Sequence, residues 1–348
     1  MRNETIHSPS KKDLVQRALQ GFPVPRVPVG PLAVHFCTRL TGCTLRQYST
    51  DARLMAEAVV RYYERFRPDA IWLSADTWIS AEAMGARVGA QSDDQPLGGL
   101  EGPAIRTIQD IDRIPPPDAS SQGRYPMMLE ALSRTLTAVG KEAWVVACMD
   151  QYPFSLAAAL MGINEIMVKV LDDPPFVEAL MERCVEYQLA YGKALAAAGA
   201  DMLSGGDSPA GLLGPALYSS LALPFEKRVI QGLQASTHKP VSLHICGNTV
   251  QMLGAMATSG ADCLEIDHWV DLAEGCQRIG PGIGLWGNLD PVGVLSRGSP
   301  ESVQRAARRA VYAAKSCGHH RFILSSGCTL AMETPFENLE ALVQAGRY

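Results

Sequence analysis

Short apolar runs alternate with amphipathic stretches along most of the chain. Eight of these runs, most of them rich in Val, Ile and Leu, end in or near Gly, Asp, Asn or Ser, which is typical of parallel strands buried on both faces. They span residues 28–36, 70–76, 143–150, 200–207, 239–246, 261–267, 283–290 and 321–328. Apolar residues at steps of three and four predict helices between strands, over 51–67, 174–198 and 300–316.

Strands that alternate with helices imply a parallel sheet joined by right-handed crossovers. Eight such units predict an α/β fold that closes into a single (β/α)8 TIM barrel over residues 23–348, preceded by a short helical extension at 1–22. An open doubly wound sheet is the alternative, although no G-x-G-x-x-G follows any of the strands. Gly and Pro clusters at 88–125 predict an excursion between the second and third strands, with a short helix over 107–114.

Composition and charge narrow the class of function. The net charge is −5 and no basic block is present, so neither nucleic acid nor a membrane surface is an expected partner. The N-terminus lacks the apolar core of a signal peptide, and no run of about 18 apolar residues predicts a spanning helix. Nine cysteines at irregular spacings favour free thiols in a reducing cytoplasm over a disulfide framework.

The stretch L-H-I-C-G-N-T at 243–249 is the strongest local signal for chemistry. Residues two apart in a strand point to the same side, so His244 and Cys246 can reach one point near the carboxyl end of the fifth strand. Cys328 ends the eighth strand and opens onto the same mouth of a barrel. One imidazole and two thiolates form a typical zinc set with an open fourth position, whereas the competing interpretation is that the cysteines merely pack.

Five carboxylates gather at the same predicted mouth. Four of them end predicted strands and the fifth lies two residues before one of these; they are Asp76, Asp207, Asp267, Asp290 and Glu265. Such groups can supply a fourth metal ligand, accept a proton or anchor a substrate, but a strand-end Asp can equally cap the next helix. We expect Asp207 and Asp76 to orient substrate or handle protons.

Other histidines and cysteines are expected to be structural. His319 and His320 precede the last strand, on the opposite rim, and are predicted to be surface residues. Cys37 and Cys43 lack the His partner or C-x-x-C spacing of a second metal site. The remaining cysteines are expected to pack in the core.

Several stretches carry a family resemblance that covers nearly the whole chain. They are R-A-L-Q-G-F-P-V-P-R-V-P-V (17–29), A-D-T-W-I-S-A-E-A-M-G (75–85), Y-P-F-S-L-A-A-A-L-M-G (152–162), G-D-S-P-A-G-L-L-G-P (206–215) with F-E-K-R (225–228), and W-G-N-L-D-P (286–291). The chain thereby resembles the uroporphyrinogen decarboxylase superfamily, and within it the corrinoid-linked methyltransferases. Asp76 falls on an acidic position of the superfamily.

Two features separate the branches of this superfamily. The decarboxylases carry an R-Q-A-G-R-Y stretch whose arginines hold substrate carboxylates, whereas this chain has H-F-C-T-R-L-T-G at 35–42 with only Arg39. The methyltransferases carry H-x-C and a distant Cys as zinc ligands, and His244, Cys246 and Cys328 fall on those positions. In that branch an acidic residue can hold the fourth site, which suggests Asp267 or Glu265 here.

The resemblance implies zinc, a corrinoid methyl carrier on a separate protein, and a small substrate. A zinc-bound thiol would accept a methyl group from the corrinoid, or zinc would activate a methoxylated compound so that the corrinoid is loaded instead. Two other classes stay open: a carboxy-lyase without metal, and a non-catalytic corrinoid or tetrapyrrole binder.

Overall fold

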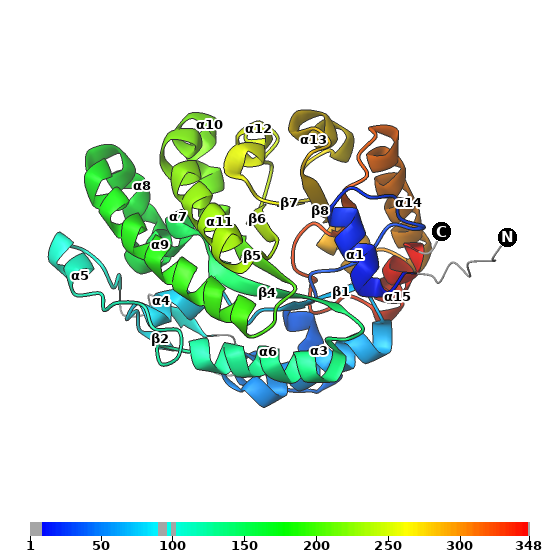
Figure 1. Cartoon of the computed structure of the whole chain (residues 1–348), viewed down its shortest axis with the longest axis horizontal. Helices are drawn as coiled ribbons and strands as arrows, with labels where there is room; N and C mark the ends of the chain where they lie inside the picture. The colour runs from blue at the N-terminus through cyan, green and yellow to red at the C-terminus, as the bar shows by residue number, and fades with distance from the viewer. Residues whose placement is uncertain (1–8, 90–95, 99–101, 347–348) are drawn as a thin grey trace.

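A curled parallel sheet forms the centre of the molecule (Figure 1). The computed structural model describes residues 9–89, 96–98 and 102–346. Within these residues the sheet has seven strands in the order β1-β4-β5-β6-β7-β8-β9, and every neighbouring pair is parallel. The strands are β1 (Ala70–Leu73), β4 (Trp144–Gln151), β5 (Met202–Gly206), β6 (Val241–Ile245), β7 (Cys263–Ile266), β8 (Gly284–Leu289) and β9 (Phe322–Ser326).

Helices surround the sheet, as right-handed crossovers require. The longer ones are α3 (Ala52–Phe66), α6 (Tyr125–Val139), α7 (Pro153–Met161), α8 (Ile163–Asp172), α9 (Pro174–Ala197), α11 (Leu223–Thr237), α13 (Leu272–Ile279), α14 (Pro300–Ser316) and α15 (Phe336–Ala345). Short helices are α2 (Leu45–Thr50), α4 (Ile79–Ala83), α5 (Ile108–Asp112), α10 (Gly214–Leu217) and α12 (Leu253–Met256), and tighter or wider turns are η1 (His35–Leu40), η2 (Ser208–Leu213), η3 (Tyr218–Ala222), η4 (Ala257–Ser259) and η5 (Pro291–Ser296). The helices predicted over 51–67, 174–198, 300–316 and 107–114 are confirmed as α3, α9, α14 and α5.

The excursion predicted over 88–125 holds a small antiparallel pair before α5. Its strands are β2 (Val88–Gly89) and β3 (Leu97–Gly98), and Val88 is paired with Gly98. Residues 90–95 and 99–101 of the excursion lie outside the described part of the chain.

The predicted first strand, 28–36, is the one that the structure does not form. Val29 makes a single parallel bridge with Leu324 of β9. Gly30 N–H donates to the Leu324 carbonyl at 3.0 Å, and Asp69 N–H donates to the Val29 carbonyl at 2.8 Å. The segment 28–30 therefore joins β9 to β1, but Pro28 and Pro31 lack the N–H groups that a longer ladder needs, and the chain turns into η1.

Helix α1 (Lys11–Leu19) covers the end of the sheet where the strands begin. Its buried Val15, Ala18 and Leu19 pack with Trp72, Trp144 and Trp286 in one apolar cluster. The Trp286 indole N–H donates to the Gly30 carbonyl at 2.7 Å, and a Cβ at Gly30 would lie 2.6 Å from the indole ring. Only glycine therefore fits at position 30. The extension assigned to residues 1–22 thus contributes, through α1, to the same core as the sheet.

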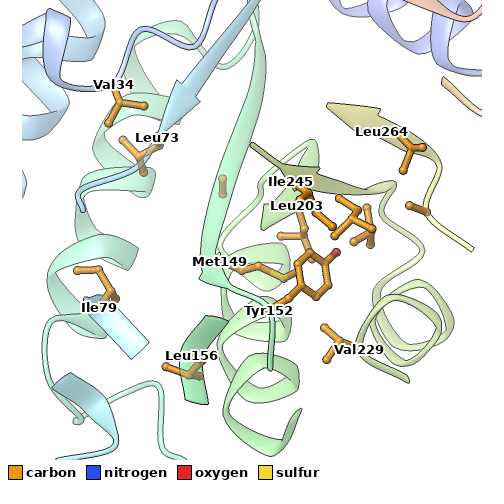
Figure 2. Close-up of a cluster of buried hydrophobic side chains, with 14 of the residues drawn as sticks. Val34, Leu73, Ile79, Met149, Tyr152, Leu156, Leu203, Val229, Ile245 and Leu264 are labelled. Carbon is orange, nitrogen blue, oxygen red and sulfur yellow. The ribbon is translucent and has the colours of Figure 1, made fainter. Parts of the chain in front are cut away.

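A second, larger apolar cluster lies between the sheet and its helices (Figure 2). Figure 2 shows Tyr152 surrounded by Met149, Leu203 and Ile245, which come from or next to three neighbouring strands. The Tyr152 hydroxyl donates to the Ser242 carbonyl at 2.7 Å, so a large aromatic group is buried there without losing its hydrogen bond.

His319 corrects another expectation. It is only 2% exposed, whereas a surface position was predicted, and its neighbour His320 is exposed. The N–H of His319 donates to the Ala314 carbonyl at the end of α14, and His319 lines a small pocket together with Phe22 and Val27. Burial lowers the pKa of His319.

All nine cysteines lie in the described residues and all are free thiols. Among those same residues no single helix is long and apolar enough to cross a bilayer; α7 and α8 reach that length only together, across a bend of 111°.

The bond network of Asp69 gives a test of how the sheet is joined. Its carboxylate accepts two hydrogen bonds from Arg26 at 2.6 Å and one from Val29 N–H at 2.9 Å. We expect Asp69→Ala to cost about 3 kcal/mol, because it leaves the Arg26 charge without its partner. Thermal unfolding should then shift down by roughly 5 °C. Asp112→Ala, at an exposed position, is the control, and equal midpoints for the two variants would show that segment 28–30 is not held by Asp69.

Candidate metal centre and its cavity

Three side chains from two separate strands meet at the mouth of the sheet. His244 lies in β6, Cys246 follows it, and Cys328 follows β9. Cys246 Sγ is 2.9 Å from His244 Nε2 and 3.6 Å from Cys328 Sγ. Their ligand atoms all lie within 4.8 Å of one another. The structure therefore brings together the three residues predicted as metal ligands.

The chemistry of this donor set fits zinc. Two thiolates on bonds of about 2.3 Å with a tetrahedral angle are about 3.8 Å apart, close to the observed sulfur separation. His244 Nδ1 lies 3.0 Å from the Glu265 carbonyl, so a proton on Nδ1 is satisfied there and Nε2 is free to coordinate. His244 Nε2 and Cys246 Sγ, 2.9 Å apart, need to separate by about 0.6 Å to reach the spacing of two tetrahedral zinc ligands.

The pKa values of His244, Cys246 and Cys328 are shifted in different directions or by different amounts. The hydrogen bond with Cys328 lowers the pKa of Cys246 to about 7, and the same contact, together with burial, raises that of Cys328 to about 12. Burial alone would lower the pKa of His244, but its hydrogen bond to Cys328 and the nearby Glu265 raise it to about 9. Cys246 therefore ionises first, and a bound cation would replace the protons that remain.

Neither carboxylate suggested as a fourth ligand belongs to this group. Glu265 is buried and accepts hydrogen bonds from the hydroxyls of Ser204, at 2.7 Å, and Ser242. Asp267 accepts from Gly247 N–H at 2.8 Å and contacts His268 at 2.7 Å. Among the described residues the metal group thus comprises three side chains, and both acids already bind other donors.

A cavity of about 430 Å³ opens beside the three residues. His244, Cys246 and Cys328 form one part of its wall, and Asp76 and Asp150 form another. A volume of this size suits a small organic molecule. The candidate metal group therefore faces a space in which a substrate could lie.

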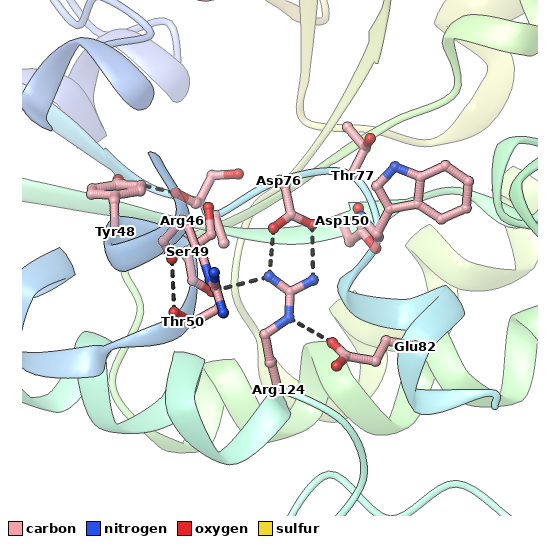
Figure 3. A network of polar contacts seen from close by, with 12 residues as sticks. Arg46, Tyr48, Ser49, Thr50, Asp76, Thr77, Glu82, Arg124 and Asp150 are labelled. Atoms are coloured by element: carbon pink, nitrogen blue, oxygen red, sulfur yellow. Dashed lines mark hydrogen bonds and ion pairs between the residues drawn. The ribbon is translucent and has the colours of Figure 1, made fainter. Parts of the chain in front are cut away.

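Asp76 lies in a charged network beneath this wall (Figure 3). Arg124 donates to both of its carboxylate oxygens, at 2.5 and 3.1 Å, and also to Glu82 at 2.5 Å. A further bond runs from Arg124 to the Ser49 carbonyl at 3.0 Å. The structure thus fixes Asp76 in one orientation at the cavity wall. Arg124 belongs to the excursion at 88–125, and no signal in the sequence pointed to it.

Asp150 is a cavity residue that the sequence analysis missed. It is the second-to-last residue of β4 and has φ of 74°, a conformation that Asp and Asn adopt more readily than most residues. One oxygen accepts from Ser80 N–H at 2.8 Å, whereas the other, buried, has no hydrogen-bond partner among the described residues. Burial raises its pKa to about 7. The strand-end rule that selected the other acids would have found it.

Asp207, expected to act in catalysis, is not at the cavity wall. It is fully buried and accepts from the Ser155 backbone N–H at 2.8 Å and hydroxyl at 2.5 Å. Its other side faces Glu226, to which the Tyr218 hydroxyl donates at 2.6 Å. Burial raises the pKa of Asp207 to about 6 and that of Glu226 well above its usual range. The pair therefore holds a proton inside the core.

The remaining strand-end acids hold loops. Asp290 accepts from the N–H groups of Val292 and Gly293, both at 2.9 Å, as the cap of η5. Asp267 ties the loop after β7 to the loop after β6. His268, between Asp267 and Asp290, is not part of the cavity wall, and Trp269 is 66% exposed. The capping interpretation is therefore correct for Asp290.

Comparisons with known proteins identify the family of the chain and a solved structure of similar fold. A model of the family described as Uroporphyrinogen decarboxylase (URO-D) matches residues 10–348. The chain is 29% identical to methylcobamide:CoM methyltransferase MtbA from Methanosarcina mazei, over 97% of both chains. It is also 29% identical to uroporphyrinogen decarboxylase from Prochlorococcus marinus, over 96% of both. A solved methyltransferase from Methanosarcina mazei superposes with a TM-score of 0.86 at 25% identity, covering 97% of this chain and 98% of that one.

The buried pair of Asp207 and Glu226 predicts how stability depends on pH. Both pKa values are raised on folding, so the contribution of each group is full below about pH 4. The contribution of Asp207 is lost as the pH rises through about 6, and that of Glu226 as the pH rises through its own raised pKa. We expect Glu226→Gln, which removes one titrating group and lets an amide face Asp207, to flatten the decline of the unfolding midpoint between pH 5 and 8. Thermal melts over this range measure it. Glu178→Gln, on the exposed side of α9, should keep the wild-type slope, and a slope unchanged in Glu226→Gln would contradict the shared proton.

Proposed function

Because the chain belongs to the uroporphyrinogen decarboxylase family, we propose that it is a zinc-dependent methyltransferase of that family. In this proposal it moves a methyl group between a corrinoid and a small thiol or methoxylated compound. The observation that carries the proposal is the group of His244, Cys246 and Cys328 at the cavity wall, a donor set for which a metal-free decarboxylation has no use.

Zinc at this site would keep a thiol ionised, or polarise an ether oxygen, at neutral pH. The chain's own residues hold the ligands in place for it. The Glu265 carbonyl orients His244, and Gly247, at φ of 88°, turns the chain directly after Cys246. The Asp267 carboxylate fixes that turn through the Gly247 N–H. Reduced Cys246 and Cys328 are required, which agrees with the cytoplasmic location that we infer from the cysteine pattern.

The size of the cavity supports separate places for the two reactants. A corrinoid is much larger than the small molecule that 430 Å³ can hold, so it would meet the substrate at the mouth, presented by a carrier protein. An apolar groove of about 400 Å³ adjoins the cavity and shares Gln151, Ser155 and Pro209 with it. Trp78 and Ile163 lie along this groove. Substrate binding in the cavity and corrinoid approach over the groove would bring the methyl group to the metal.

The alternative is a carboxy-lyase without metal, and relatives with that name are as similar to this chain as the methyltransferases are. A substrate with many carboxylates needs cationic partners. Arg39, the one arginine in the corresponding stretch, donates instead to the carbonyls of Met332 at 2.9 Å and Thr334 at 2.5 Å, and it packs over Phe336. Arg39 is therefore not free to bind a substrate carboxylate, which favours the methyltransferase proposal over the carboxy-lyase.

Metal analysis and a spectral assay test the proposal together. Purified protein should contain about one zinc per chain, and methylcobalamin with a thiol, or cob(I)alamin with a methyl ether, should show a change in cobalt absorbance. Cys328→Ser should lose most of the zinc and lower the rate by at least about a hundredfold, because a thiolate ligand is removed. Cys317→Ser, which changes an exposed cysteine, is the control.

Zinc-free protein with full activity, or Cys328→Ser with unchanged zinc and rate, would refute the metal role. If the protein contains no zinc and no combination of corrinoid and substrate changes the cobalt absorbance, the carboxy-lyase is the better hypothesis.

A further inference from the structure

Two cysteines outside the metal group lie where helices α13 and α14 pack side by side (Figure 1). Cys276 is in α13, and Cys317 is the residue that caps the end of α14. Cys276 is only 4% exposed, whereas Cys317 is open to solvent. Neither residue lines the cavity or belongs to the metal group, so any chemistry of this pair is separate from the candidate metal centre.

The turn of α13 at Ala273 is the place where the two sulfur atoms meet. Cys317 Sγ lies 3.9 Å from the Ala273 carbonyl oxygen. Cys276 follows Ala273 by three residues in the same helix, and a helical side chain leans back over the turn that precedes it. The Cys276 thiol therefore lies over the same turn, and a hydrogen bond joins it to the Cys317 thiol. A buried thiol and an exposed thiol from different helices are thus adjacent.

A covalent link between the two sulfurs needs a movement of Cys317 alone. Bonded sulfur atoms are about 2.05 Å apart, which is shorter than the contact of two thiols. Cys317 is the last residue before the chain leaves α14, and Gly318 follows it with φ of 68°. Because Cys317 is exposed and at a helix end, its sulfur can approach Cys276 without opening the core.

We propose that Cys276 and Cys317 form a reversible disulfide by exchange with a small disulfide such as glutathione disulfide. The Cys317 thiolate attacks one sulfur of the small disulfide, so a mixed disulfide forms and one molecule of the small thiol leaves. Cys276 then loses its proton to water, its sulfur attacks the Cys317 sulfur, and a second molecule of the small thiol leaves. Two protein thiols are thereby oxidised, and one small disulfide is reduced to two thiols.

The different burial of the two cysteines determines the order of these steps. Burial raises the pKa of Cys276 to about 12, so this thiol stays protonated and does not react with a molecule in solution. Once Cys317 carries the mixed disulfide, the sulfur to be attacked is held beside Cys276, and this proximity offsets the small fraction of thiolate. Disulfides in a reducing cytoplasm are usually transient, which agrees with a reversible link. The inference depends neither on methyl transfer nor on a bound metal.

Mass spectrometry of an unreduced digest tests the proposal. The whole chain is treated with glutathione disulfide at pH 8, and the remaining thiols are alkylated before digestion. Cleavage after Glu, Lys and Arg places Cys276 in the peptide 275–278, apart from Cys246 and Cys263, and Cys317 in the peptide 316–321. We expect these two peptides to be linked to each other, and dithiothreitol to restore both free thiols.

Two variants separate the two steps of the exchange. Cys276→Ser should stop the reaction after the first step, so that at least about tenfold more Cys317 keeps a glutathionyl group than in wild type, because the neighbouring thiol no longer displaces it. Cys317→Ser should leave Cys276 as a free thiol, because burial protects it from the small disulfide. Cys43→Ser, which changes a partly exposed cysteine elsewhere in the chain, is the control and should give the same link as wild type.

Three results would overturn the proposal. They are a wild-type Cys317 that keeps glutathione, a disulfide that joins Cys317 of two chains, and equal amounts of mixed disulfide in wild type and Cys276→Ser. Thermal melts of the reduced variants show whether each one is folded. The linkage found in wild type decides the question even if Cys276→Ser does not fold, because it needs no substitution.

Discussion

The hydrogen bonds around segment 28–30 determine whether the candidate site exists at all. This segment bonds to Leu324 on one side and to Asp69 on the other, so it joins β9 to β1 across what would otherwise be two free sheet edges. Cys328 lies just beyond β9, and Asp76 lies just beyond β1. Without this junction the curled sheet could open, and the acidic and metal-binding parts of the cavity wall would separate.

Three different arrangements stabilise the carboxyl groups that are buried in the interior. Asp76 is neutralised in part by Arg124, Asp207 and Glu226 share a proton, and Glu265 accepts hydrogen bonds from two serine hydroxyls. Each arrangement lowers the cost of burying a carboxyl group. Asp150 differs in its position, because it lines the cavity, where one of its oxygens accepts from Ser80 N–H.

The pattern of apolar runs was sufficient to predict seven strands, the principal helices and the meeting of His244, Cys246 and Cys328. Strand ends in a parallel sheet share one edge, so spacing in the sequence translates directly into proximity. The prediction of a first strand over 28–36 was wrong because Pro28 and Pro31 lack the N–H groups that strand pairing needs. A hydrophobicity pattern does not detect this loss. Asp207 was expected at the mouth of the sheet but lies in the core, because a strand-end acid can point inward, here toward Glu226 in the following helix α11. Arg124 is brought to Asp76 by α6, from a stretch with no periodic signal.

Because the two cysteines lie far apart along the chain, a metal ion bound by both would affect the stability of the sheet. Cys246 and Cys328 are 82 residues apart, and β7 and β8 lie between their strands in the sheet. A metal ion held by both would cross-link a long loop of the chain, as a disulfide does, and would restrict the unfolded state far more than a ligand bound within one segment. The ion would then connect the end of β6 to the end of β9 across the two strands between them. Its loss would loosen the fold on the side where the substrate binds, so that metal occupancy and the shape of the cavity are coupled.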